Sequence, residues 1–164
     1  DVVFSNAVLH WVKDHRPVVN SIYACLRPGG RLLLQMGGQG NARAVVGVLD
    51  TLLGLRKYRR SFEGFEFPYG FHGVAYYQDL LAEAGFVRRR VELIEKDMEH
   101  SGVEGLKGWI RTTWLPYTGR LEESARDGFI DELAQRYLEL VPLDAQGRAH
   151  VAMVRLEVEA QKPQ

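Results

Sequence analysis

The 164-residue sequence lacks the features that mark several large classes of protein. Its single cysteine, Cys25, excludes a disulfide within the chain and any metal site built from several cysteines. No apolar run approaches the roughly 20 residues that a membrane-spanning helix needs. The 21 basic and 21 acidic residues cancel, so no excess charge favours a nucleic acid or an anionic membrane as partner. We therefore expect a cytoplasmic protein that binds neither.

The chain is long enough to bury one sizeable core, and it contains no internal repeat or low-complexity segment. It opens on Asp1, inside a run that reads as a strand, and we therefore expect it to be a fragment of a longer protein. Cys25 stands among apolar helical positions, which predicts a small core residue and not a nucleophile.

The first third of the chain reads as a strand, a helix and a second strand. The apolar runs 2–4 and 32–34 have no polar alternation, which is typical of parallel strands covered on both faces. Between them, Asp14 can cap a helix that contains Pro17 in its first turn, and the segment Arg27-Pro28-Gly29-Gly30 would end it. This order predicts a right-handed crossover unit of a parallel sheet.

The rest of the chain alternates between helical and strand patterns. Helices are expected in segments 42–55, 77–84 and 102–140, and a loop rich in aromatic residues is expected in segment 61–73. Apolar and polar residues alternate in segments 87–93 and 154–160, which predicts two strands. The whole pattern predicts an α/β fold, with the last two strands as antiparallel neighbours at a sheet edge.

Three motifs carry a resemblance to a known family. The segment Asp1-Val2-Val3-Phe4-Ser5-Asn6-Ala7-Val8-Leu9-His10-Trp11 resembles the fourth-strand motif of class I S-adenosylmethionine-dependent methyltransferases of the type 11 group. Leu26-Arg27-Pro28-Gly29-Gly30 resembles the turn before their fifth strand, and Leu80-Leu81-Ala82-Glu83-Ala84-Gly85-Phe86 resembles the junction before their sixth. The three together are specific, whereas each alone is weak.

The resemblance implies the C-terminal half of a Rossmann-like methyltransferase sheet, with a helical cap inserted before the last strand. On this reading residues 1–164 are a partial domain and residues 102–148 are the cap. The cap segment 109–117 is similar to that of the trans-aconitate methyltransferase family. The class places a glycine-rich loop after its first strand and an acidic residue after its second, and neither is present here. We therefore expect the chain to carry one side of the cofactor pocket and to be inactive by itself.

The resemblance also assigns the site residues nearest the cofactor. Ser5, Asn6 and Ala7 follow the first strand at its carboxyl end, where open α/β sheets bind ligands, and they are expected to bind S-adenosylmethionine. The alternative is that Ser5 and Asn6 only cap the next turn. Trp11 is expected to wall this site, and His10 to orient the acceptor or take a proton, although both can instead be packing residues.

The acceptor is expected to meet side chains from two later segments. These predicted substrate-binding residues are Tyr69, His72, Trp109, Arg111, Trp114 and Tyr117. The planar guanidinium of Arg111 suits a carboxylate, and its alternative partner is one of the many glutamates. No metal site is expected, because His10, Asp14 and His15 have no recognised ligand spacing. A phosphate cradle at the glycine-rich segment 37–41 is a weaker alternative to a simple turn.

The leading function is therefore methyl transfer to a small acceptor, a carboxylic acid such as trans-aconitate. A quinone or polyketide intermediate is the alternative acceptor, since the aromatic loop can line an apolar pocket. A different class of function is a non-catalytic chain that forms a homodimer through an exposed sheet edge, where Val2, Phe4, Leu32 and Leu34 would present apolar surface. A dehydrogenase shares the strand-helix-strand unit, but no dehydrogenase catalytic set is present.

Overall fold

The computed structural model describes residues 1–164, which form two compact units. Unit 1 comprises residues 1–41, 68–96 and 153–164, and unit 2 comprises residues 42–67 and 97–152. None of the helices combines the length and the apolar character that crossing a membrane requires.

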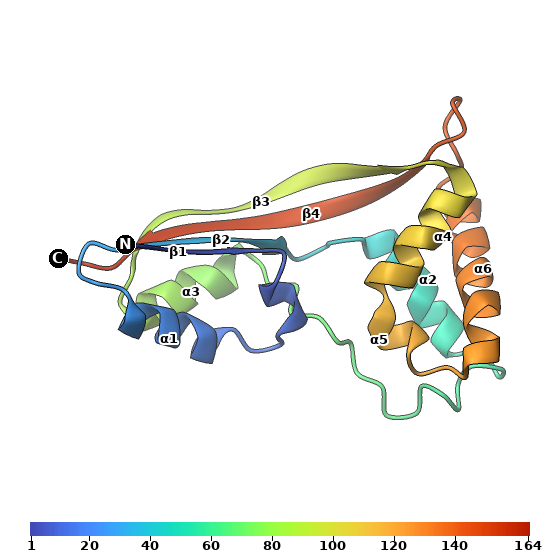
Figure 1. Cartoon of the computed structure of the whole chain (residues 1–164), viewed down its shortest axis with the longest axis horizontal. Coiled ribbons are helices and arrows are strands. Elements are labelled where there is room, and N and C mark those ends of the chain that lie inside the picture. Colours follow the sequence, from blue (N-terminus) through green and yellow to red (C-terminus); the bar gives the residue numbers. More distant parts are fainter. The chain divides into compact units, whose positions relative to one another are not determined.

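Four strands form one sheet in the order β1-β2-β4-β3 (Figure 1). Their bounds are Val2–Asn6 for β1, Arg31–Gly37 for β2, Val87–His100 for β3 and Ala149–Gln161 for β4. β1 runs parallel to β2, and β2 runs antiparallel to β4. The predicted α/β fold is confirmed, as is the expectation that the last two strands are neighbours at an edge.

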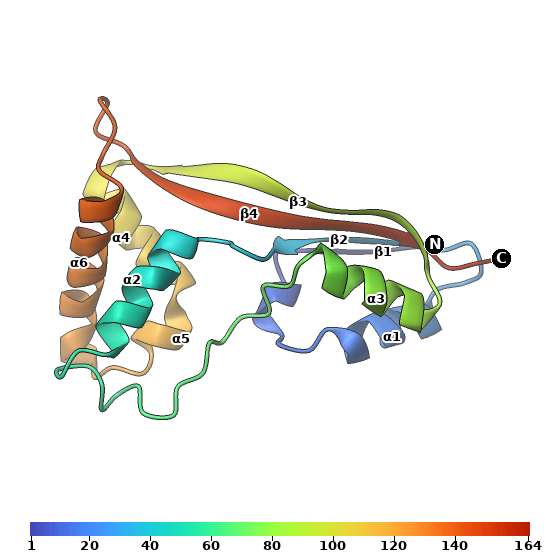
Figure 2. The same cartoon turned by 180° about the vertical axis from the view of Figure 1, so that it is seen from behind.

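Unit 1 contains three helical segments, of which the second and third follow predicted signals. The 3₁₀ helix η1 (Leu9–Trp11) comes after β1, and α1 (Arg16–Cys25) has a proline in its first turn. α3 (Val74–Ala84) ends at Gly85, whose φ of 87° a residue with a side chain rarely adopts. Figures 1 and 2 show that α1 and α3 lie on the same face of the sheet.

The core of unit 1 lies between that sheet face and the two helices. Leu32 and Leu34 point into it and are buried, together with Val19, Leu80 and Leu81 from the helices. Because Leu32 and Leu34 are buried, the apolar surface expected at these two residues is absent.

The prediction that both faces of the first strand are covered is wrong, because α1 and α3 cover only one face. The other face of β1 is open to solvent. Val2 is 55% exposed and Phe4 is 66% exposed. β1 is also an edge strand, since its only sheet neighbour is β2. The predicted exposed edge is therefore present, and its apolar side chains are Val2 and Phe4.

Unit 2 is helical, apart from the ends that β3 and β4 contribute to it. Its helices are α2 (Arg43–Leu53), α4 (Gly102–Thr113), α5 (Leu115–Thr118) and α6 (Glu123–Leu140). Phe129, Leu133 and Tyr137 recur every four residues along α6 and face the interior, where each side chain is at most 1% exposed.

Two local expectations are corrected by the structure. Cys25 is exposed, because it lies about 120° around α1 from the buried Val19 at 100° per residue. The strand predicted in segment 87–93 is longer than expected, because β3 extends to His100.

Candidate functional site

The candidate site in unit 1 begins where β1 ends. Ala7 has a φ of 56°, a left-handed conformation that costs energy for a residue with a side chain, and its amide donates to the Gln35 carbonyl at 2.8 Å. Ser5 and Asn6 precede it, and neither side chain makes a hydrogen bond to protein. The turn therefore presents two unengaged polar side chains at the carboxyl end of a parallel strand, as a ligand site of an α/β sheet requires. Neither side chain caps the following helical turn, since η1 has no side-chain cap hydrogen bond.

His10 follows on η1, which is held in place by the buried side chain of Leu9. The imidazole Nδ1 of His10 lies 3.2 Å from the backbone nitrogen of Gly37, at the end of β2. The amide N–H of Gly37 can only donate, so Nδ1 must accept and the proton of the neutral ring is on Nε2. Burial lowers the pKa of His10, which favours this neutral form.

Aromatic rings surround this histidine on two sides. The ring of Trp11 lies 5.2 Å from that of Tyr69, and Tyr69 is stacked on Phe71 at 5.1 Å. The Phe71 ring is 6.1 Å from the His10 ring. The backbone of Gly70, between the two aromatic residues, donates to the His10 carbonyl at 2.9 Å. The rings of Trp11 and Tyr69 thus contact each other. The structure places six of the predicted site residues in unit 1, namely Ser5, Asn6, Ala7, His10, Trp11 and Tyr69.

The glycine-rich segment after β2 is a turn and not a phosphate cradle. Three of its amides are already used within the protein: Gly38 donates to the Val154 carbonyl, Gln39 to the His72 carbonyl and Asn41 to the Gly38 carbonyl. A phosphate cradle needs free N–H groups that converge on the ligand. The side chain of Asn41 completes the turn by accepting from the Val154 amide at 2.9 Å.

His15 and His72 are both held by contacts within unit 1, and acceptor binding by His72 remains a prediction. His15 is fully buried, and its two ring nitrogens lie 2.7 Å from the Tyr77 hydroxyl and 2.9 Å from the Val12 carbonyl. His72 stacks on Tyr76 at 3.7 Å and bonds to the Lys13 carbonyl. Because both ring nitrogens of His15 are engaged, His15 offers no ligand atom to the metal set of His10, Asp14 and His15 that the sequence raised.

The predicted cap residues all lie in unit 2. Trp114 and Tyr117 are buried, and the Trp109 ring lies edge-on to that of Trp114 at 5.9 Å. Arg111 is exposed and pairs with Asp127 at 3.3 Å. The ion-pair alternative for Arg111 is therefore realised, with an aspartate in place of a glutamate. Contact of these four side chains with an acceptor remains a prediction.

The aromatic loop is divided between the units. Phe62 and Phe65 pack against Tyr117 in unit 2, with ring centroids 6.3 and 4.8 Å from the tyrosine. Tyr69 and Phe71 belong to unit 1. The loop therefore contributes aromatic rings to both units.

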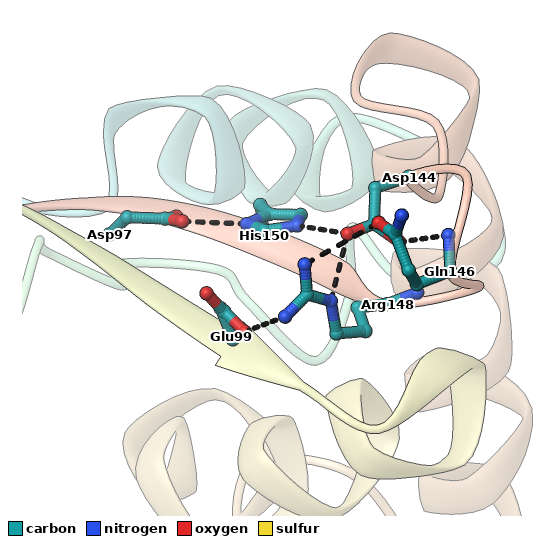
Figure 3. A network of polar contacts seen from close by, with 6 residues as sticks. All are labelled: Asp97, Glu99, Asp144, Gln146, Arg148 and His150. Atoms are coloured by element: carbon teal, nitrogen blue, oxygen red, sulfur yellow. Dashed lines mark hydrogen bonds and ion pairs between the residues drawn. The ribbon is translucent and has the colours of Figure 1, made fainter.

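A polar network in unit 2 was missed from the sequence (Figure 3). His150, on β4, bonds through Nδ1 to Asp97 of β3 at 2.6 Å and through Nε2 to Asp144 at 3.0 Å. Arg148 joins Asp144 to Glu99. Hydrogen bonds to the two aspartates raise the pKa of His150, with that to Asp144 contributing most. The residues come from segments about 50 positions apart, so no local sequence pattern could have grouped them.

This network also contains the residue types that bind metals. Ligand atoms of Asp97, Glu99 and His150 lie within 4.8 Å of one another. Each is already engaged, since His150 bonds Asp97 and Arg148 bonds Glu99. A metal would have to displace these internal partners, so the arrangement is explained as an ion-pair network.

Comparison with known proteins agrees with the fold and with the motifs. A family model described as a methyltransferase domain matches residues 1–34. Trans-aconitate 2-methyltransferase of Variovorax paradoxus is 28% identical over 99% of this chain and 62% of its own length. Juvenile hormone acid O-methyltransferase of Drosophila melanogaster is 27% identical over 80% of this chain and 45% of its own.

A solved structure shows the same fold. The crystal structure of a putative methyltransferase from Bacillus halodurans C-125 matches 99% of this chain and 64% of its own, with a TM-score of 0.57 and 15% identity. The predicted resemblance to class I methyltransferases, with the Rossmann-like fold, is confirmed. The chain spans less than two thirds of the length of these relatives.

Proposed function

We propose that this chain is part of an S-adenosylmethionine-dependent methyltransferase. The observation that carries the proposal is the turn of Ser5, Asn6 and Ala7, which lies within the segment that matches the methyltransferase model. In the structure this turn stands at the carboxyl end of a parallel strand with its polar side chains unengaged. Both features support a ligand site at this position.

The residues present fit one side of a cofactor pocket. Ser5 and Asn6 would hold polar groups of S-adenosylmethionine, and Trp11, which is 45% exposed, would cover it with an apolar ring. The cofactor, when bound, supplies an activated methyl group. The work of the chain is then to position the acceptor and to exclude water, which is the main protein contribution in such a displacement.

We propose a small carboxylic acid as the acceptor. The two relatives named above carry acids in their names, trans-aconitate and juvenile hormone acid. His10 would face the acceptor, with Tyr69 beside it. His72, Trp109, Arg111, Trp114 and Tyr117 remain proposed acceptor ligands. A quinone or polyketide intermediate is the alternative acceptor, and competition between acid and aromatic acceptors separates the two.

The test compares this chain with the protein as its native host makes it. Intact mass gives the native length, and calorimetric titration with S-adenosylmethionine gives the affinity of both. The proposal expects a longer native protein that binds the cofactor and methylates an acid, while the 164-residue chain binds it weakly or not at all. Micromolar binding by the isolated chain would refute the expectation that it binds the cofactor weakly, and the absence of binding by both proteins would refute the proposed function.

A second candidate, homodimerisation, is favoured by the edge of β1. The amide of Ala7 and the carbonyl of Asp1 both bond to β2. Because backbone groups alternate along a strand, those of Val2 and Phe4 point away from β2 and lack a strand partner. Unpaired groups beside exposed apolar side chains recruit another strand, and a second copy of the chain offers the same edge.

A further inference from the structure

His10 has one ring nitrogen committed to the protein and one left over. Nδ1 accepts from the Gly37 amide at 3.2 Å. Nε2 makes no hydrogen bond to protein, and the side chain is half-buried. The committed nitrogen fixes what the other can do: in the neutral ring, Nε2 carries the proton and can only donate.

Three further contacts hold the ring in this orientation. The backbone carbonyl of His10 accepts from the Gly70 amide at 2.9 Å. The rings of Trp11 and Phe71 lie 5.5 and 6.1 Å from the imidazole. At Gly37 a Cβ atom would come within 2.9 Å of the Phe71 ring, so the donor amide is also tightly placed.

The chemistry of the acceptor decides whether such a group helps. A carboxylate is already a nucleophile and needs only to be positioned, which a neutral N–H donor does well. An amine or a phenol must lose a proton, which requires a base with a free lone pair. The fixed His10 ring offers no free lone pair, because that of Nδ1 is occupied by Gly37 and that of Nε2 by its own proton.

We propose that His10 is a specificity-determining residue that donates its Nε2 proton to an anionic oxygen of the acceptor, and that it does not act as a general base. This rests on the proposed function and deepens it, since it selects carboxylate acceptors over amines and phenols. Gly37 becomes a positioning residue, which acts by fixing the tautomer of His10.

The first test is nitrogen-15 NMR of the histidine rings, on the 164-residue chain and on the native-length protein with S-adenosylhomocysteine. We expect the Nε2–H tautomer at His10 at neutral pH. Titration with tricarballylate, a saturated tricarboxylate, should shift the Nε2–H resonance, whereas its neutral trimethyl ester should not. An Nδ1–H tautomer, or an imidazolium at pH 7, would overturn the proposal. So would the absence of any tricarballylate response in both proteins.

The second test uses a matched pair of variants in the native-length protein. His10→Gln keeps an N–H donor near the position of Nε2, and His10→Asn keeps an acceptor for the Gly37 amide but removes the distal donor. We expect His10→Asn to raise KM for the acid acceptor about tenfold to a hundredfold, as for a lost hydrogen bond to a charged group. His10→Gln retains a donor, so its KM should stay closer to that of the unsubstituted protein.

The pH profile separates donation from base catalysis. A donor gives a kcat that stays level as the pH falls through the pKa of His10, whereas a base gives a kcat that falls with slope one below that pKa. If His10 were the base, this fall would disappear in both variants. The NMR titration does not depend on turnover. If it gives the expected result and no methyl transfer occurs, the proposed function fails while the donor role of His10 stands.

Discussion

The hydroxyl of Tyr77 lies 2.7 Å from Nδ1 of His15, and both side chains are completely buried. Nε2 of His15 lies 2.9 Å from the Val12 carbonyl, which can only accept, so Nε2 carries a proton. Burial lowers the pKa of His15, and the ring is therefore neutral, with Nδ1 accepting from Tyr77. This pair joins α3 to the segment that leads from η1 into α1.

Replacing Tyr77 with phenylalanine should destabilise unit 1. The substitution leaves Nδ1 of His15 buried without a donor, which costs about 1–3 kcal/mol. Urea unfolding followed by circular dichroism measures the change. Tyr23→Phe is the control, because the Tyr23 hydroxyl makes no hydrogen bond, and it should change stability by less than about 0.5 kcal/mol. Equal effects of the two substitutions would show that the His15 bond contributes nothing.

The network around His150 should make unit 2 sensitive to pH. The pKa of His150 is raised above its ordinary value of 6.5, first by Asp144 and then by Asp97, while Arg148 and Glu99 complete the surroundings. A raised pKa gives a stabilisation that is fully present below 6.5 and is lost as pH rises through the raised value. Amide exchange in segment 144–150, corrected for intrinsic rates, should therefore show less protection at about pH 9 than at about pH 6.

The control for this prediction is His150→Gln, whose amide group can donate to a carboxylate but does not titrate. Its protection in segment 144–150 should vary little over the same pH range. Equal protection of the unsubstituted chain at the two pH values would contradict the role given to His150.

Gly70 should tolerate no side chain. A Cβ atom there would overlap the Val12 carbonyl oxygen and come within 2.9 Å of Nε2 of His15. Gly70→Ala should therefore cost about 1–3 kcal/mol or more, as for an overpacked core. Gly47→Ala is the matched substitution on α2, where no atom lies within 4 Å, and it should stabilise by up to about 1 kcal/mol. Thermal unfolding of both variants gives the comparison, and a tolerated Gly70→Ala would mean that this backbone can move.

The proposed homodimer can be tested at Phe4. Phe4→Lys places a charge at the edge of β1 and should shift the chain from dimer to monomer in sedimentation velocity. Leu140→Lys is the control, because Leu140 is also 66% exposed but lies at the end of α6. If the unsubstituted chain is monomeric at every concentration tested, or if both variants dissociate it equally, the β1 edge is not the interface.

The strands and most helices were predictable because their signals are local. The apolar runs of β1 and β2, the proline in α1 and Gly85 after α3 each act within a few residues of the chain. The exposure of Phe4 was not predictable in this way, since an apolar run does not reveal how many faces of a strand are covered. Tertiary packing decides that question.

The site was only partly predictable for a similar reason. The positions of Ser5 and Asn6 follow from the rule that ligands bind at the carboxyl ends of parallel strands. The bond between His10 and Gly37 joins residues 27 positions apart, and no pattern encodes the direction of a ring nitrogen. The network of His150 depends in the same way on the alignment of β3 with β4.

The turn of residues 37–41 has a consequence for selectivity among adenosine compounds. The amides of Gly37, Gly38, Gln39 and Asn41 already donate within the protein, so the turn has no set of converging donors for a phosphate. A nucleoside triphosphate shares the adenosine group of S-adenosylmethionine but brings several negative charges that need such donors. At this turn the phosphates of the nucleotide would therefore lose water without gaining protein donors, so the turn offers no affinity for the charges that distinguish the nucleotide from S-adenosylmethionine.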